Sequence, residues 1–229
     1  FWRICLASRM DKTELAIDLL KEAIDADYWY STNLLRTDTD LEPLQGLPAF
    51  EELVEICAER HTMAQAKATP GLIMLEPEST SLTTRPPWPL LMALHGHNSN
   101  AKMSIDPWRP MTSKGWLLAL PQSSQIITPD GYTWIDKERA KKEIQIHYAT
   151  LSEQHTIDQE RVIVGGFSMG GGLAIELALS SAMPMCGFIA VAPYLSDINH
   201  VISFLESSKG TKVRGYITVG ELDDVCYEN

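Results

Sequence analysis

Cysteine, basic residues and long uncharged runs are all scarce in this 229-residue sequence. The four cysteines form no CxxC pair or other metal-ligand spacing, so they indicate neither a metal site nor a need for an oxidising compartment. Lysine and arginine number 19 against 30 acidic residues, and the net charge of −11 argues against nucleic acid or an anionic membrane as a partner. The longest uncharged run, residues 177–196, is interrupted by two prolines and a glycine, which excludes one membrane-spanning helix.

What remains is an ordinary globular composition, with 45% apolar and 21% charged residues. The most informative stretch is 161–172, Arg-Val-Ile-Val-Gly-Gly-Phe-Ser-Met-Gly-Gly-Gly. Its β-branched run predicts a buried strand, the glycines end that strand, and an apolar helical pattern follows. Ser168 is therefore predicted on a sharp strand-to-helix turn within Gly166-x-Ser168-x-Gly170, where a Cβ at either glycine would strike the strand or the helix. Such a turn holds the serine hydroxyl away from the sheet, next to the N-terminus of the following helix. This placement predicts that Ser168 is a nucleophile.

This motif resembles the nucleophile turn of the α/β-hydrolase superfamily, which implies a mostly parallel sheet with helices on both faces. Residues 69–229 fit that expectation, because strand patterns alternate there with helical ones. Strands are predicted at 72–75, 90–94, 116–120, 162–164, 187–191 and 215–219, with a long loop over 122–133. Ligands bind at the carboxyl ends of such strands, where all the candidate residues below lie.

Residues 1–68 are predicted to form a separate helical segment, with amphipathic stripes near residues 15–24 and 50–57. The segments Leu41-Glu42-Pro43-Leu44 and Pro48-Ala49-Phe50 resemble the last unit of a tetratricopeptide-like array. A plain helical cap on the hydrolase domain is the alternative. Nothing in this segment predicts chemistry, although a protein partner could bind its helices.

The superfamily's catalytic residues occur in the order serine, acid, histidine. The predicted strand at 215–219 continues into Gly-Glu-Leu-Asp-Asp, and its Gly-x-x-Asp spacing nominates Asp223 as the triad acid. Asp224 is the second candidate, since adjacent acids cannot be separated without the loop conformation. A capping role in a turn is the structural alternative for both.

Two backbone N–H groups are needed to stabilise an oxyanion. One belongs to Met169, the residue after the predicted nucleophile. Leu94-His95-Gly96 resembles the phospholipase/carboxylesterase and acyl-protein thioesterase group, which implies that the backbone of His97 donates the other and that His95 is structural. The chain departs from that group at residues 98–100, Asn-Ser-Asn, so feruloyl-esterase or polyester-depolymerase relatives stay open.

Trp134, in a Trp-x-Asp segment resembling the same esterases, is expected either to line the substrate site or to anchor its loop in the core. Gln122 is a further candidate for a polar substrate contact. The resemblance implies no metal and no cofactor.

No histidine follows Asp223 in the sequence, which predicts a chain cut short before the triad base and therefore close to inactive. We predict a serine hydrolase that cleaves carboxylic esters or thioesters through an acyl-enzyme on Ser168. A prolyl-oligopeptidase-type peptidase and an inert hydrolase-fold binding or scaffold protein are the alternatives.

Overall fold

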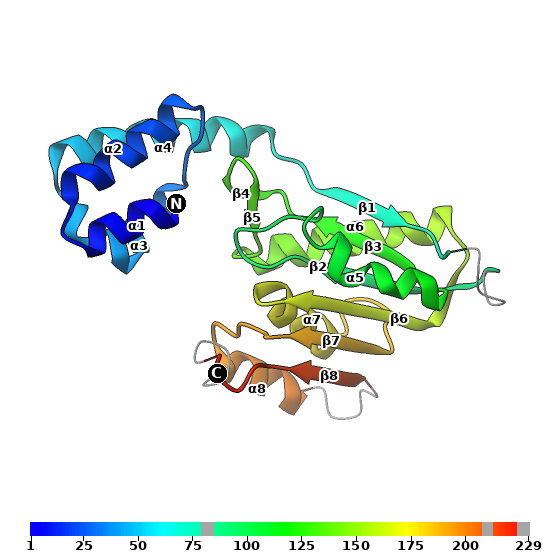
Figure 1. The fold of residues 1–229 in the computed structure, drawn as a ribbon. Helices are drawn as coiled ribbons and strands as arrows, with labels where there is room; N and C mark the ends of the chain where they lie inside the picture. The colour runs from blue at the N-terminus through cyan, green and yellow to red at the C-terminus, as the bar shows by residue number, and fades with distance from the viewer. Residues whose placement is uncertain (79–84, 208–212, 224–229) are drawn as a thin grey trace. The chain divides into compact units, whose positions relative to one another are not determined.

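The computed structural model of the chain describes residues 1–78, 85–207 and 213–223. The chain divides into two compact units (Figure 1). A helical unit comprises Phe1–Ala68 together with Gln125–Gly131, and a sheet unit comprises Thr69–Ser124 and Tyr132–Asn229. Among the described residues, no helix combines the length and the apolar character needed to cross a membrane.

Amphipathic helices build the helical unit, namely α1 (Trp2–Arg9), α2 (Thr13–Asp25), α3 (Thr32–Thr37), the 3₁₀ helix η1 (Thr39–Leu44) and α4 (Pro48–Lys67). Proline stands at the first position of α4, where its missing N–H has no cost. The two predicted apolar stripes are largely buried; they contribute Ala16, Leu19, Leu20 and Ile24 from α2 and Phe50, Leu53, Val54 and Cys57 from α4.

Residues 125–131, predicted as part of a long loop, instead pack with the helical unit. They include β4 (Gln125–Thr128), which pairs with β5 (Gly131–Thr133) in a two-stranded sheet. Backbone groups connect this segment to the helices. Ser31 N–H donates to the carbonyl of Ile127 over 2.7 Å, and Nε2 of His61 lies 2.9 Å from the carbonyl of Ile126. The loop prediction was wrong because β4 and β5 form a local hairpin, whereas the bonds that attach it to the helices are long-range and leave no local sequence signal.

A six-stranded sheet forms the second unit, in the order β1-β3-β2-β6-β7-β8. Its strands are β1 (Gly71–Leu75), β2 (Trp88–Leu94), β3 (Leu117–Gln122), β6 (Ile157–Phe167), β7 (Gly187–Val191) and β8 (Arg214–Thr218). Only β1, at one edge, runs antiparallel to its neighbour; the other pairs are parallel. The carboxyl ends of β2, β6, β7 and β8 therefore meet at one edge of the sheet.

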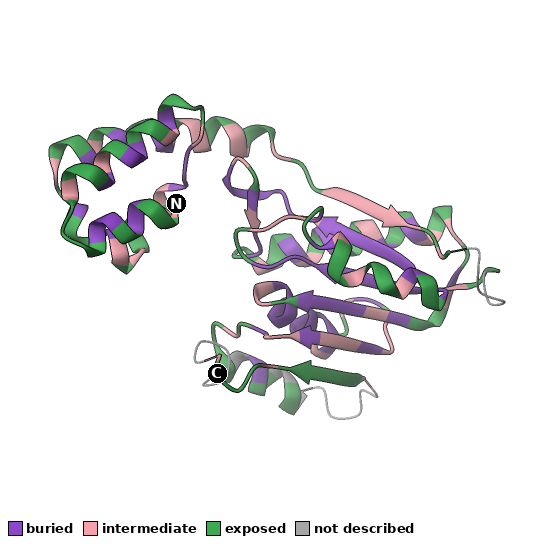
Figure 2. Cartoon of the chain, viewed as in Figure 1, coloured by how far each residue is buried: buried purple, intermediate pink, exposed green. Residues whose placement is uncertain are grey.

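Helices cover both faces of this sheet. Alternate residues of β2, such as Leu90 and Met92, pack against α6 (Lys137–Gln154) and α7 (Met169–Leu179). Leu91 and Ala93 point to the other face, beside α5 (Ile105–Trp108) and the 3₁₀ helix η2 (Arg109–Lys114). Figure 2 shows the result, with β2, β3 and β6 largely buried and β8 exposed along its length.

The structure thus has the mostly parallel, helix-covered sheet that the sequence predicts. Some details differ from the prediction, among them α5 and η2, which the sequence analysis did not predict. Strand β6 extends over eleven residues, where only its apolar centre was predicted. Helix α8 (Ile198–Ser207) was not predicted at all; through Val201 it packs beside Ile175 of α7 and Ala190 of β7.

Candidate active site

Ser168 occupies a one-residue turn between β6 and α7. Its backbone has φ 52° and ψ −120°, a conformation that side-chain-bearing residues seldom adopt. Neighbouring backbone fixes the turn from both sides. The Ser168 N–H donates to the carbonyl of Val191 over 2.9 Å, and the Ser168 carbonyl accepts from the N–H of Tyr194 over 3.0 Å. Bonds to the last residue of β7 and to the loop that follows it therefore hold the strained backbone of Ser168 in place.

The glycines around Ser168 are required by close backbone approach. A Cβ at Gly166 would lie 2.3 Å from the carbonyl carbon of Gly170, across the turn. A Cβ at Gly170 would lie 2.5 Å from the carbonyl oxygens of Leu94 and His95. The first turn of α7 therefore lies directly against the loop that follows β2, as it must if that loop supplies an oxyanion donor.

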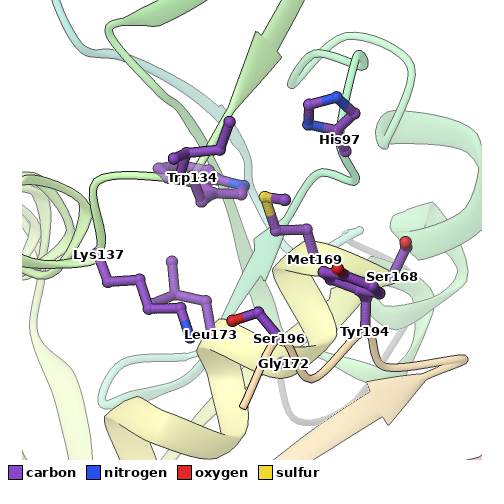
Figure 3. Close-up of a pocket in the computed structure, with 10 residues that line it drawn as sticks. His97, Trp134, Lys137, Ser168, Met169, Gly172, Leu173, Tyr194 and Ser196 are labelled. Carbon is purple, nitrogen blue, oxygen red and sulfur yellow. The ribbon is translucent and has the colours of Figure 1, made fainter. Parts of the chain in front are cut away.

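A cavity of about 430 Å³ opens beside Ser168 (Figure 3), within the size range of small-molecule sites. Much of its wall is apolar or aromatic, and its polar side chains come from four segments of the sheet unit. The lining residues are His97, Trp134, Ile135, Lys137, Ser168, Met169, Gly172, Leu173, Tyr194 and Ser196.

Both predicted oxyanion donors belong to this lining. Met169 begins α7, so its N–H has no intrahelical acceptor. His97 lies in the loop after β2, and its Nδ1 is 2.9 Å from Oγ1 of Thr133, which in turn donates to Sδ of Met169 over 3.3 Å. His97 is exposed as a residue, but partial desolvation of its imidazole lowers the pKa of His97.

Trp134 anchors its loop in the core. Its indole is fully buried, stacks on the imidazole of His95 with ring centroids 4.5 Å apart, and donates through Nε1 to the His95 carbonyl over 2.8 Å. The same residue lines the cavity. Asp136, the acid of the Trp-x-Asp segment, caps α6 by accepting from the N–H of Arg139.

His95 has the bonds of a structural residue. Its Nδ1 lies 2.8 Å from the carbonyl of Gly96, and its Nε2 accepts from the N–H of Ser123 over 3.4 Å. Burial lowers the pKa of His95 to about 4, so the ring is neutral at pH 7.

Gln122 lies elsewhere. Its Oε1 accepts from the N–H of Ala101 over 2.9 Å, and its Nε2 donates to the carbonyl of Ser123 over 3.2 Å. It is not among the residues that line the described cavity. Its amide supports the loop after β3 instead.

Asp223 follows β8 at the sheet edge that carries Ser168. In the parallel register, Phe167 pairs with Val191, and Val191 pairs with Thr218 at the end of β8. Asp223 is partly exposed in the turn that follows, and its N–H donates to the carbonyl of Gly220 over 3.0 Å. Asp224, the second candidate, lies outside the described residues.

Sequence reasoning missed the polar pair Lys137 and Glu176 and the lining residues Tyr194 and Ser196. Glu176 is buried on α7 and accepts a hydrogen bond from the ammonium of Lys137, which lines the cavity. One signal was available. Glu176 is the only charged residue in the apolar helical run that follows Ser168, and a buried charge requires a partner.

One cluster of possible metal ligands occurs among the described residues, in the helical unit. The ligand atoms of Cys5, Asp38 and Asp40 lie within 4.8 Å of one another. Burial raises the pKa of Cys5 to about 11, so its thiol stays protonated at pH 7, and Arg9 already pairs with Asp40 at 3.4 Å. These groups therefore give no reason to assign a metal to the chain.

Comparison with known proteins agrees with this arrangement. The helical segment, predicted to resemble a tetratricopeptide unit, matches the family model of the A/B hydrolase-like N-terminal domain over residues 1–65. Residues 135–214 match the phospholipase/carboxylesterase family.

Among solved structures, an uncharacterized protein from Bacillus cereus ATCC 10987 is 32% identical, with a TM-score of 0.58 over 98% of this chain and 70% of its own. The acetyl xylan esterase from Aspergillus awamori is 14% identical, with a TM-score of 0.54 over 70% of each chain, which is a likeness of fold. From these matches and the sheet topology, the chain belongs to the α/β-hydrolase superfamily and carries a helical N-terminal segment.

Proposed function

We propose that this chain is a serine hydrolase that cleaves carboxylic esters or thioesters through an acyl-enzyme on Ser168. The observation that carries the proposal is the strained Ser168 turn at the wall of a cavity of ligand size. The match of residues 135–214 to the phospholipase/carboxylesterase family supports an ester as the bond that is cleaved.

In the proposed reaction, Oγ of Ser168 attacks the ester carbonyl while a base takes its proton. The backbone N–H groups of Met169 and His97 stabilise the oxyanion. The alcohol or thiol leaves with the transferred proton. Water then attacks the acyl group on Ser168, which releases the carboxylic acid and returns a proton to the serine oxygen. Asp223 is the proposed acid that orients the base.

Ser168 depends on a base, because a serine hydroxyl is a weak nucleophile at neutral pH. Within the described part of the chain, no histidine is hydrogen-bonded to Oγ of Ser168. We therefore expect residues 1–229 on their own to turn over esters slowly.

The test is hydrolysis of p-nitrophenyl acetate and butyrate by the protein and its variants. Ser168→Ala should lower kcat by at least about 10³-fold. Ser180→Ala is the matched control, because Ser180 ends the same helix and is not a lining residue of the cavity. Undiminished turnover in Ser168→Ala would contradict the proposal. Cleavage of a prolyl p-nitroanilide in place of the esters would indicate the peptidase alternative.

A further inference from the structure

We propose that Lys137 and Ser196 form a polar subsite in the Ser168 cavity, which binds an uncharged hydrogen-bond-accepting oxygen on one arm of the ester. Both residues line the cavity. Figure 3 shows the Lys137 amine and the Ser196 hydroxyl directed toward each other, across from His97. The proposal rests on the proposed function, since it assigns the substrate class of the same site.

Lys137 is fixed in place by a buried acid. The side chain of Glu176 is 2% exposed, and its Oε1 accepts from the Lys137 ammonium. Its other oxygen, Oε2, has no hydrogen-bond partner among the described residues. If Lys137 turned away into solvent, Glu176 would become an uncompensated buried charge, which is strongly unfavourable. The ion pair therefore keeps the ammonium at the cavity wall.

An ammonium carries three N–H donors, of which Glu176 Oε1 takes one. The side chain of Lys137 is 31% exposed and lines the cavity, and an ammonium with one acceptor has two further donors to offer a ligand there. The hydroxyl of Ser196, an exposed residue, adds another donor. An acyl or alcohol arm that ends in a ketone, hydroxyl or amide oxygen would satisfy these donors.

The charge balance selects against an anion. Glu176 neutralises Lys137 directly. The subsite thus offers donors without net positive charge, so a ligand carboxylate finds no uncompensated cation there. A plain alkyl arm would remove water from these donors without replacing its hydrogen bonds, which is the usual basis of discrimination by a polar pocket.

The test is binding of uncleaved esters to the Ser168→Ala protein, measured by ligand-observed NMR titration. Ethyl levulinate carries a neutral ketone, ethyl pentanoate a plain alkyl arm and monoethyl succinate a carboxylate. Ethyl levulinate should bind about tenfold more tightly than either of the others, as expected for a hydrogen bond to a charged donor.

Two changes should remove this preference by independent routes. Lys137→Met with Glu176→Leu replaces the ion pair by apolar side chains and leaves no buried charge, so the preference should fall to less than about twofold. Ser196→Ala leaves the ion pair intact and should lower the preference about threefold. Lys141→Met is the control; this lysine lies one turn further along α6, pairs with Glu138 and is not a lining residue.

A preference that survives both changes, equal binding of the three esters, or no binding at all would overturn the subsite. Tightest binding of monoethyl succinate would overturn its neutral character. Because Ser168→Ala cannot form an acyl-enzyme, these outcomes do not depend on catalysis. Failure of the proposed function is instead seen in the p-nitrophenyl ester assay.

Discussion

Gly46 in the helical unit and Gly166 in the sheet unit show how differently the two parts of the molecule are packed. A Cβ at Gly46 would meet nothing within 4 Å, whereas a Cβ at Gly166 would lie 2.3 Å from the backbone of Gly170. Charged groups differ in the same way. Arg36 and Glu51 of the helical unit pair with both side chains partly exposed, whereas in the sheet unit the acid Glu176 is buried and pairs with Lys137 at the cavity wall. In the sheet unit, the backbone is tightly packed at Gly166 and the charged Glu176 is buried. In the helical unit, Gly46 is loosely packed and Glu51 is partly exposed.

Replacing these two glycines should give the largest contrast. Gly166→Ala is expected to cost about 4 kcal/mol or more, because the methyl group overlaps a backbone carbonyl that cannot move without opening the Ser168 turn. Gly46→Ala should cost only about 1–2 kcal/mol, from its φ of 79°. Hydrogen exchange followed separately in the two units gives both values, even if the units unfold independently. Equal losses would refute the difference in packing.

Removing the cation of each ion pair should give the second contrast. Lys137→Met is expected to destabilise the sheet unit by about 3–5 kcal/mol, because Glu176 is left as a buried, unpaired charge. Arg36→Met leaves Glu51 in water and should cost far less. Urea denaturation of the two variants checks this difference.

Lys137→Met combined with Glu176→Leu should recover most of the lost stability, since it removes the buried charge together with its partner. If Lys137→Met alone cost no more than Arg36→Met, Glu176 would not depend on Lys137, and the argument for a fixed ammonium at the cavity would fail.

The two units should lose stability in different pH ranges on acidification. Burial lowers the pKa of His95 to about 4 from an ordinary 6.5, so the unfolded chain binds a proton in this range that the folded chain excludes. The sheet unit should therefore lose roughly 3 kcal/mol as the pH falls from 6.5 to 4. His95→Gln should reduce this slope, and the part that remains is expected from His97 and His147, whose pKa values burial also lowers. Denaturation midpoints measured across this range provide the test.

The helical unit should respond at lower pH. The side-chain hydrogen bond from Arg36, helped by the N–H of Gly46, lowers the pKa of Glu51 to about 2. A lowered carboxyl pKa stabilises the fold above the ordinary value of 4.5, and the contribution is lost as the pH falls from there toward 2. A helical unit that weakened above pH 5 along with the sheet unit would contradict this order.

Local sequence signals account for most of the fold and for the Ser168 turn. The β-branched strand, the glycines and the apolar helix around Ser168 predicted its backbone path, because close packing there allows almost no other residues. The periodic stripes of α2 and α4 were equally clear, since amphipathic helices repeat every three to four residues.

What escaped prediction depends on contacts between distant segments. Strand β4 pairs locally with β5, but its bonds to Ser31 and His61 join distant parts of the chain, so nothing in residues 125–128 alone predicts that it packs with the helices. Lys137 and Glu176 lie 39 positions apart on two helices, and only the packed structure shows that they meet. Gln122 was nominated on residue type alone, and its amide bonds the loop instead.

Covalent capture of Ser168 tests the nucleophile assignment most directly. The protein is treated with a fluorophosphonate probe and digested, and its peptides are mapped by mass spectrometry. We expect one adduct per chain, on Oγ of Ser168; it should be absent from Ser168→Ala and undiminished in Ser180→Ala. An adduct on another residue, or labelling that persists in Ser168→Ala, would show that this turn does not carry the nucleophile.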